Sequence, residues 1–375
     1  MVEVSVHKPK DKLINVQIMR AAAALMVVTL HAQAFGVHNP NFSTPNFVPF
    51  TLIQLGNGVD IFFVISGFII TLASARIVQE RNIAEFVRRR IVRIVPLYWA
   101  ILTVWIALIL VKSAILHDPT AAKQITPVNV VGSYLFYPVD GMGYGPKYPF
   151  PILDLGWTLN FEMLFYVLFA LCMVAGPKWF NIRLALTLFC LIFIGFTPLA
   201  SEPPLSFWSQ PITLEFLAGV GLALAYRAGW RIGAFGQILL IAVGMIVWML
   251  LRERTFGPIP IGAKGSYSWP RVASCGVGAV LIMAGAVLGV RQWRNWLGRR
   301  VADLGDASYA LYLTHVLTFT AWRLALEALP LKVDWNWGLT LVMVLSAIVV
   351  AEATHLLIEK PLTEWLNRLG RTRTV

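Results

Sequence analysis

The sequence predicts an all-α, polytopic membrane protein with about ten transmembrane helices. Apolar residues make up 58% of the chain and charged residues only 13%, whereas a soluble domain carries roughly 25% charged residues. Apolar runs of about 17–25 residues, the length that crosses a bilayer as a helix, recur throughout. Because the bilayer core offers no water to backbone groups, each of these runs must form a helix.

The expected spans follow one another along the whole chain. They lie near residues 14–35, 52–74, 94–112, 156–176, 182–199, 209–226, 236–251, 272–290, 305–327 and 338–358. We expect a polar N-terminal tail over residues 1–12, one membrane domain over 13–360 and a C-terminal tail over 361–375. Pro361 should end the last helix, because proline interrupts the helical hydrogen bonds.

The net charge of +12 is distributed as in a membrane protein. With both termini in the cytoplasm, most Lys and Arg residues fall in inner segments, as the positive-inside rule requires. This basic excess would face lipid headgroups and could also meet an anionic cytoplasmic ligand. The distribution argues against nucleic acid as a partner.

Neither a disulfide framework nor a metal site is expected. Cys172, Cys190 and Cys275 all lie within expected spans, and no metal-ligand spacing occurs. The N-terminal region could instead be a cleaved signal peptide, since Ala32-Gln33-Ala34 resembles a cleavage site. Arg20 interrupts the apolar region, so we expect the first span to be retained.

Two strongly polar residues stand within the first expected span. Arg20 and His31 are eleven positions apart, which on a helix places them about 16 Å apart along the axis and only about 20° apart around it. One helix face therefore carries a cation at one depth and an imidazole at another. Ionisable groups inside a membrane are costly and are functional candidates by default.

Two carboxylates are expected near the depth of His31. Asp60 could cap the start of its helix, where the helix dipole favours a carboxylate, or it could orient a functional imidazole. Glu162, among Phe, Met and Leu, must be protonated, paired or facing water. These groups could also be polar links between helices, but we take His31, Asp60 and Glu162 as catalytic candidates. His315 is expected to be a hydrogen-bonded packing residue rather than a catalyst.

A cluster of arginines precedes the third expected span, in what we expect to be a short loop over residues 75–93. Arg90 and Arg93 would share one face if helical. They could serve membrane topology alone, or their guanidinium groups could bind phosphates.

Aromatic residues near the fourth span suggest a substrate site. Tyr148 lies in the long connection 113–155, which we expect on the outer side. Trp157 begins the span and Tyr166 follows Glu162 by one turn. Aromatic faces could pack on sugar rings, and an interfacial aromatic belt is the alternative.

Several stretches together resemble the acyltransferase 3 family of integral-membrane acyltransferases. They are Arg20 and His31 with ten residues between them; Gly58-Val59-Asp60-Ile61-Phe62-Phe63-Val64-Ile65-Ser66-Gly67-Phe68; Phe86 with Arg90-Ile91-Val92-Arg93-Ile94-Val95-Pro96; and Leu304-Gly305-Asp306 with Ser308-Tyr309, Tyr312-Leu313 and His315. The stretch Gly156-Trp157-Thr158-Leu159-Asn160-Phe161-Glu162 resembles the exopolysaccharide-modifying branch.

The resemblance implies transfer of an acyl group, acetyl first of all, from cytoplasmic acyl-CoA to a hydroxyl of a cell-surface or exported polysaccharide or lipid-linked glycan. It also implies the plasma (inner) membrane of a bacterium and no permanently bound cofactor. Carried over by residue, His31 becomes the catalytic histidine, Arg20 its helix partner on the donor side, and Arg90 and Arg93 the contacts of the CoA phosphates. We expect His31 to act as general base, with Asp60 or Glu162 orienting it.

A transporter or flippase for a lipid-linked glycan or small anion is the alternative from another class, because polar residues at one depth could line a permeation path.

Overall fold

The computed structural model describes residues 13–38, 42–44, 47–116, 121–139, 150–251, 269–327 and 333–371, and this part of the chain is almost entirely helical. The longer helices are α1 (Ile14–His38), α2 (Gly58–Ala73), α4 (Ile83–Leu116), α6 (Trp157–Val174), α7 (Phe180–Ile194), α9 (Thr213–Arg227), α10 (Ala234–Leu250), α13 (Val277–Leu288), α14 (Trp296–Asp306), α15 (Ser308–Glu327), α16 (Trp337–Thr354) and α17 (Lys360–Arg371).

Short elements connect them. The short α-helices are α3 (Ala75–Gln79), α5 (Pro127–Tyr134), α8 (Leu205–Trp208) and α12 (Trp269–Arg271), with 3-10 turns at Leu55–Asn57, Ala121–Gln124, Asp154–Gly156 and Pro198–Ala200. Two strands, β1 (Phe42–Ser43) and β2 (Val333–Asp334), pair in parallel and join the segments that follow α1 and precede α16.

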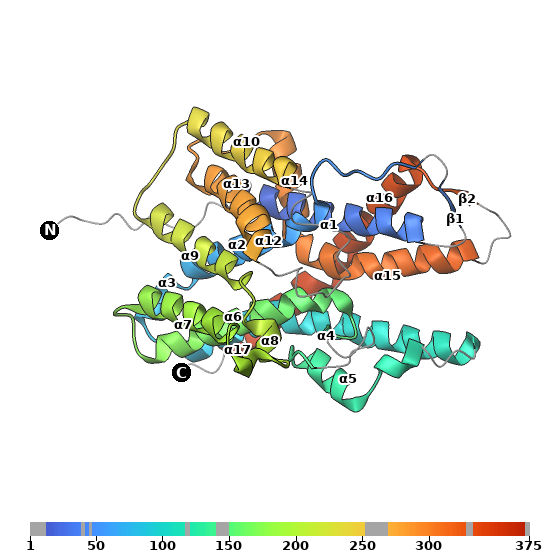
Figure 1. Cartoon of the computed structure of the whole chain (residues 1–375), viewed down its shortest axis with the longest axis horizontal. Coiled ribbons are helices and arrows are strands. Elements are labelled where there is room, and N and C mark those ends of the chain that lie inside the picture. Colours follow the sequence, from blue (N-terminus) through green and yellow to red (C-terminus); the bar gives the residue numbers. More distant parts are fainter. Residues whose placement is uncertain are drawn as a thin grey trace.

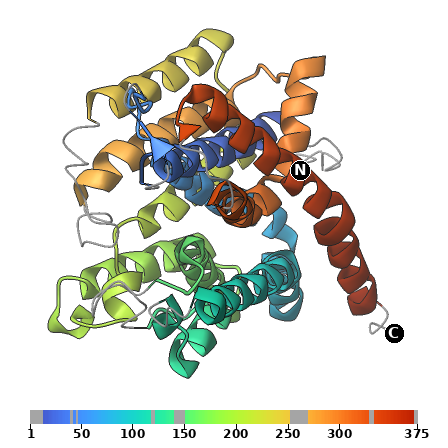
Figure 2. The same ribbon diagram turned by 90° about the vertical axis from the view of Figure 1, so that its right-hand side faces the viewer.

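The helices form two groups (Figure 1). One group contains α1, α10, α13, α14, α15 and α16, and the other contains α4, α5, α6 and α7. Figure 2 shows the second group, in cyan and green, on one side of the first. Helix α1 packs against α2, α14, α15 and α16, so the helix that carries Arg20 and His31 has neighbours on several sides.

Helices α2 and α9 run side by side through a close backbone approach. A Cβ atom added to Gly219 would lie 2.1 Å from the carbonyl oxygen of Val64, and one added to Gly67 would lie 2.0 Å from that of Phe216. Only glycine leaves room for backbones this close, as in other tightly packed membrane helices. This contact fixes α2, and with it Asp60 and Ser66, against the rest of the bundle.

A helix occurs within each of the expected spans, but the number of crossings is only partly supported. Among the described residues, six segments are long and apolar enough to cross a membrane: Ile14–Val37, Leu55–Ala73, Ile83–Ile115, Asp154–Val174, Trp269–Leu288 and Trp337–Leu369. Helices α7 and α10 are apolar but shorter. The chain is therefore a multi-pass helical membrane protein, and a total of ten spans stays a prediction.

The basic stretch before the third span is helical rather than a loop. Helix α4 begins at Ile83 and includes all the arginines from Arg88 to Arg93. Phe86 anchors this first part, because its ring is fully buried and stacks on Phe169 with a centroid distance of 4.7 Å. Arg90 and Arg93 consequently share one rigid helix face.

The prediction that Pro361 ends the last helix was wrong. A π-helical turn at His355–Glu359 leads directly into α17, and Pro361 is the second residue of that helix. Proline is tolerated in the first turn, where the backbone N–H has no partner within the helix. The expected N-terminal tail, residues 1–12, and residues 372–375 of the expected C-terminal tail lie outside the described residues.

Candidate active site

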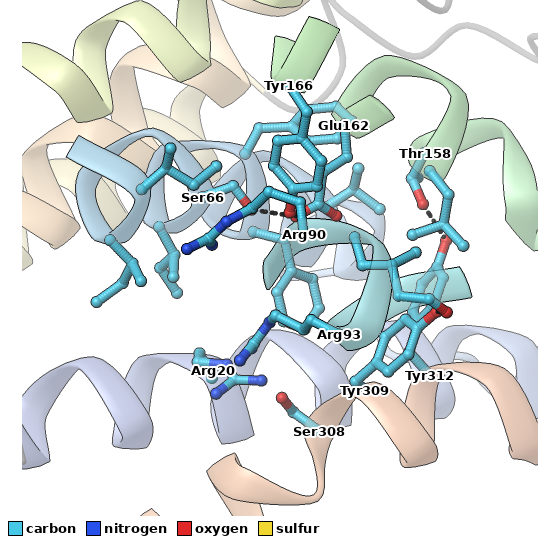
Figure 3. A pocket seen from close by; sticks show the side chains of 18 of the residues that line it. Arg20, Ser66, Arg90, Arg93, Thr158, Glu162, Tyr166, Ser308, Tyr309 and Tyr312 are labelled. Carbon is cyan, nitrogen blue, oxygen red and sulfur yellow. Dashed lines mark hydrogen bonds between the residues drawn. The ribbon is translucent and has the colours of Figure 1, made fainter. Parts of the chain in front are cut away.

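A cavity of about 170 Å³ lies where α1, α2, α4, α6 and α15 meet. Figure 3 shows its polar side chains converging from these helices. They are Gln17 and Arg20 from α1, Ser66 from α2, Arg90 and Arg93 from α4, Thr158, Glu162 and Tyr166 from α6, and Ser308, Tyr309 and Tyr312 from α15. An apolar cavity of roughly 150 Å³ holds a benzene ring, so this one can hold one part of a larger substrate.

Three guanidinium groups face the cavity. Arg20 donates to the side-chain oxygen of Gln17 at 3.0 Å, and Figure 3 shows Arg20 and Arg93 directed into the same space. Arg90 is only 9% exposed, and its Nε has no hydrogen-bond partner among the described residues. None of the three forms an ion pair with a carboxylate in the described part of the chain. Glu162 is the one carboxylate among the residues that line the cavity, so three guanidinium groups there face a single acidic side chain. This excess of positive charge favours an anion.

The carboxylate of Glu162 is held by hydroxyl groups instead. It accepts hydrogen bonds from Tyr166 at 2.5 Å and from Ser66 at 3.1 Å. The guanidinium carbon of Arg90 lies 5.9 Å from the centroid of the Tyr166 ring, so Tyr166 links the carboxylate to the cationic side of the cavity.

The neighbouring arginines of α4 have a different environment. Arg88 and Arg89 both pair with Glu85, at 2.8 and 2.6 Å, on the outside of the helix. The helix thus separates neutralised arginines from Arg90 and Arg93, which line the cavity.

His31 pairs with another histidine. Its Nδ1 lies 3.0 Å from Nε2 of His315 on α15, and the two ring planes are inclined by 24°. His315 is fully buried, whereas His31 is partly exposed. The sequence interpretation of His315 as a hydrogen-bonded residue was therefore right about the bond, but its partner could not be foreseen.

The histidine pair lies beside the cavity without lining it. Tyr312 lines the cavity, and its ring centroid is 6.3 Å from that of His315. The Tyr312 hydroxyl donates to the carbonyl oxygen of Leu155 at 2.9 Å and lies 2.9 Å from the hydroxyl of Thr158. Tyr312 therefore has both the cavity and His315 as neighbours.

Asp60 does not orient His31, contrary to expectation. Its carboxylate pairs with Arg271 at 2.7 Å, and both side chains are buried. Buried Glu215 on α9 also interacts with Asp60. Arg271 is the last residue of α12 and directly precedes a π-helical turn at Val272–Gly276. The three expected catalytic residues thus belong to three different clusters, and neither Asp60 nor Glu162 is the partner of His31.

The aromatic candidates are also separated. Trp157 packs edge-on against Phe63, Phe150 and Phe161 in the core, and Tyr166 lines the arginine cavity. Tyr148 lies outside the described residues. Among those residues, no group of three His, Cys, Asp or Glu side chains is placed to hold a metal ion.

Comparison with known families identifies the protein class. The family model for an acyltransferase domain matches residues 13–352, which is nearly the whole chain. The chain belongs to the acyltransferase 3 family. This acyltransferase is 31% identical over 331 residues to the exopolysaccharide production protein ExoZ of Rhizobium meliloti (strain 1021), covering 85% of this chain and 91% of ExoZ.

Two further relatives are more distant. Nodulation protein 10 of Rhizobium leguminosarum bv. viciae is 25% identical, with 92% of each chain covered. YrhL of Bacillus subtilis (strain 168), named as a proposed peptidoglycan O-acetyltransferase, is 24% identical over 92% of this acyltransferase and 54% of YrhL. No solved structure matches the chain.

Proposed function

We propose that this acyltransferase moves an acyl group from acyl-CoA to a hydroxyl of an exported polysaccharide or its lipid-linked precursor. Acetyl is the acyl group that we favour. The family supports acyl transfer, and the names of ExoZ and YrhL favour a polysaccharide acceptor and an O-acetyl product. The observation that carries the proposal for the donor is the set of three unpaired arginines around one cavity. The membrane would be the bacterial plasma membrane.

The donor would bind through its anionic end. Arg90 and Arg93 lie one turn apart on α4, and their planar guanidinium groups can each form two hydrogen bonds to phosphate oxygens. Arg20 faces the same cavity from α1. The cavity is too small for a whole acyl-CoA, so it would hold phosphates or the start of the thin arm. With the first turns of α1 and α4 at the cytoplasmic face, as the positive charges favour, the donor would enter from inside the cell.

His31 would act as the general base. It removes the proton from an acceptor hydroxyl while that oxygen attacks the thioester carbon. The tetrahedral intermediate then releases the CoA sulfur, which takes the proton from His31 as the ester forms. Positioned acid–base catalysis contributes about 10²–10⁴-fold to a rate.

The acyl group would pass Tyr312 on its way to His31, because Tyr312 lines the cavity and lies beside His315. The hydroxyl of Tyr312 is held by Leu155 and Thr158. A rotation of the Tyr312 side chain would join the donor cavity to the histidine pair.

The test is acyl transfer by the purified, lipid-embedded protein. Release of free CoA from acetyl-CoA and the mass gain of an added oligosaccharide would be followed together. His31→Ala should lower the rate by at least about 10² while leaving the protein folded. His355→Ala is the matched control, because His355 pairs with Glu359 at 2.7 Å and does not line the cavity; it should leave the rate nearly unchanged.

Two results would contradict the proposal. A folded His31→Ala protein with normal turnover would remove the histidine from the mechanism. A wild-type protein that transports a glycan but never releases CoA would favour the transporter alternative. Mass spectrometry of surface polysaccharides with and without the gene would identify the acyl group and its acceptor.

An acyl-histidine intermediate is the mechanistic variant. Incubation with labelled donor alone should leave no label on the protein if His31 acts only as a base. Trapped label on His31 would replace the direct transfer by two steps.

A further inference from the structure

The two histidines are joined in a chain of hydrogen bonds that ends on the backbone. Nδ1 of His315 lies 3.1 Å from the carbonyl oxygen of Leu311, one turn earlier on α15. Nε2 of the same ring lies 3.0 Å from Nδ1 of His31. These hydrogen bonds therefore connect the backbone of Leu311 to His315, and His315 to His31.

The carbonyl group of Leu311 determines which atom donates and which accepts in each of these hydrogen bonds. A carbonyl oxygen can only accept, so Nδ1 of His315 must carry the hydrogen. A neutral imidazole carries one hydrogen, and its other nitrogen is an acceptor. The contacts of the fully buried His315 ring in the described structure are His31, aromatic rings and backbone, with no carboxylate to balance a charge, and an unpaired buried charge is costly. Nε2 of His315 is thus an acceptor.

The acceptor at Nε2 of His315 determines which nitrogen of His31 carries the hydrogen. Nδ1 of His31 carries the hydrogen that Nε2 of His315 accepts, and the backbone of Val27, one turn earlier on α1, is a further hydrogen-bond partner of the His31 ring. In a neutral ring with hydrogen on Nδ1, Nε2 carries a lone pair. The two rings differ in exposure, because His31 is partly exposed and His315 is not. The basic nitrogen is therefore on the ring that a substrate can approach.

We propose that His315 is a positioning residue that fixes His31 in the Nδ1–H tautomer and leaves Nε2 free to take the acceptor proton. This inference rests on the proposed function of His31 as general base. In the transfer, the proton moves from the sugar hydroxyl to Nε2 of His31 and then to the CoA sulfur. His315 gains and loses no proton, and its lone pair stabilises the imidazolium of His31 while that cation exists.

Three substitutions at one site separate positioning from packing. His315→Gln places an amide oxygen near the former Nε2 and keeps an acceptor for His31. His315→Asn reaches only the former Nδ1 position, so it keeps the bond to Leu311 but loses the acceptor. His315→Leu fills space without either bond. A role in packing alone ranks the variants by volume, whereas positioning ranks Gln above both others.

The rate measurement uses the purified full-length protein with acetyl-CoA and an acceptor. The asparagine and leucine variants should lose at least about 10-fold in kcat, and the glutamine variant should stay within about 5-fold of wild type, as expected for a group that acts through the general base. The donor KM should change little in all three, because His315 does not line the arginine cavity. Equal kcat in the asparagine and glutamine variants would overturn the proposal.

A spectroscopic measurement tests the tautomer of His31 independently of enzyme activity. Nitrogen-15 NMR of the histidine-labelled wild-type protein, with His31 assigned from the spectrum of His31→Ala, reports which ring nitrogen carries hydrogen. The expected result is protonated Nδ1 and unprotonated Nε2 in His31. The opposite tautomer would refute the inference even if the enzyme is active. Absence of acyl transfer by the wild type would refute the proposed function, while the tautomer would still be measured.

Discussion

Replacing Arg90 by alanine removes the most deeply buried cation of the donor cavity. Arg90 is 9% exposed and its Nε has no hydrogen-bond partner among the described residues, so in the proposed complex this nitrogen can form a charge-assisted hydrogen bond to phosphate. A hydrogen bond to a charged group contributes about 1.5–3 kcal/mol. At about 1.4 kcal/mol per factor of ten, donor KM should rise roughly 10- to 150-fold.

Arg93 should contribute less because its side chain is exposed. Its interaction with the donor is screened by solvent, and about 0.2–1 kcal/mol is typical of such pairs. Arg90→Lys should recover only part of the loss, because an ammonium group cannot form the two parallel bonds of a guanidinium.

The assay is initial rate against acetyl-CoA concentration at several ionic strengths. Arg89→Ala is the matched control: it removes one charge from the same helix, but Arg89 pairs with Glu85 away from the cavity. Its donor KM should equal that of wild type. If Arg89→Ala and Arg90→Ala change the KM equally, or if Arg90→Ala changes membrane orientation with an unchanged KM, the arginines serve topology and the reasoning fails.

Four further single substitutions test the surroundings of the site. Asp60→Asn or Arg271→Gln alone should destabilise the protein by about 3–5 kcal/mol, because each breaks a buried ion pair by removing one partner. The double variant should lose less stability than the sum of the two single losses, and additive losses would show that the pair is not coupled. Gly219→Ala should lower the melting temperature in detergent, since its Cβ would lie 2.1 Å from the oxygen of Val64; an unchanged melting temperature would show that α2 and α9 separate easily. Tyr312→Phe removes the bonds to Thr158 and Leu155 and should raise the rate of acetyl-CoA hydrolysis without acceptor; unchanged hydrolysis would argue that Tyr312 does not restrict the passage.

The sequence predicted the helical membrane class and the candidates on individual helices. Hydrophobic run length reports local burial directly, so a helix was found within each expected span. Prediction from the sequence failed where contacts with other parts of the structure outweighed the local preference of a segment. The arginines before the third span looked like a loop, but burial of Phe86 extends α4 back to Ile83. Pro361 looked like a helix end, but a π-helical turn precedes it.

Depth along a helix can be read from sequence, but the direction in which each helix face points cannot. His31, Asp60 and Glu162 were expected to be neighbours because they were assigned similar depths. Their partners are His315, Arg271 and Tyr166, respectively, two of which come from distant parts of the chain.

By itself, then, the sequence determined that this protein is a bundle of apolar helices with costly polar groups inside it, because the cost of exposing backbone and charge to hydrocarbon depends on local composition. Only the tertiary structure decided which polar groups meet. Helix rotation and packing are set by contacts such as that of Gly67 and Gly219 with the facing backbones, between residues far apart in sequence, and those contacts place the arginines around one cavity and His315 against His31.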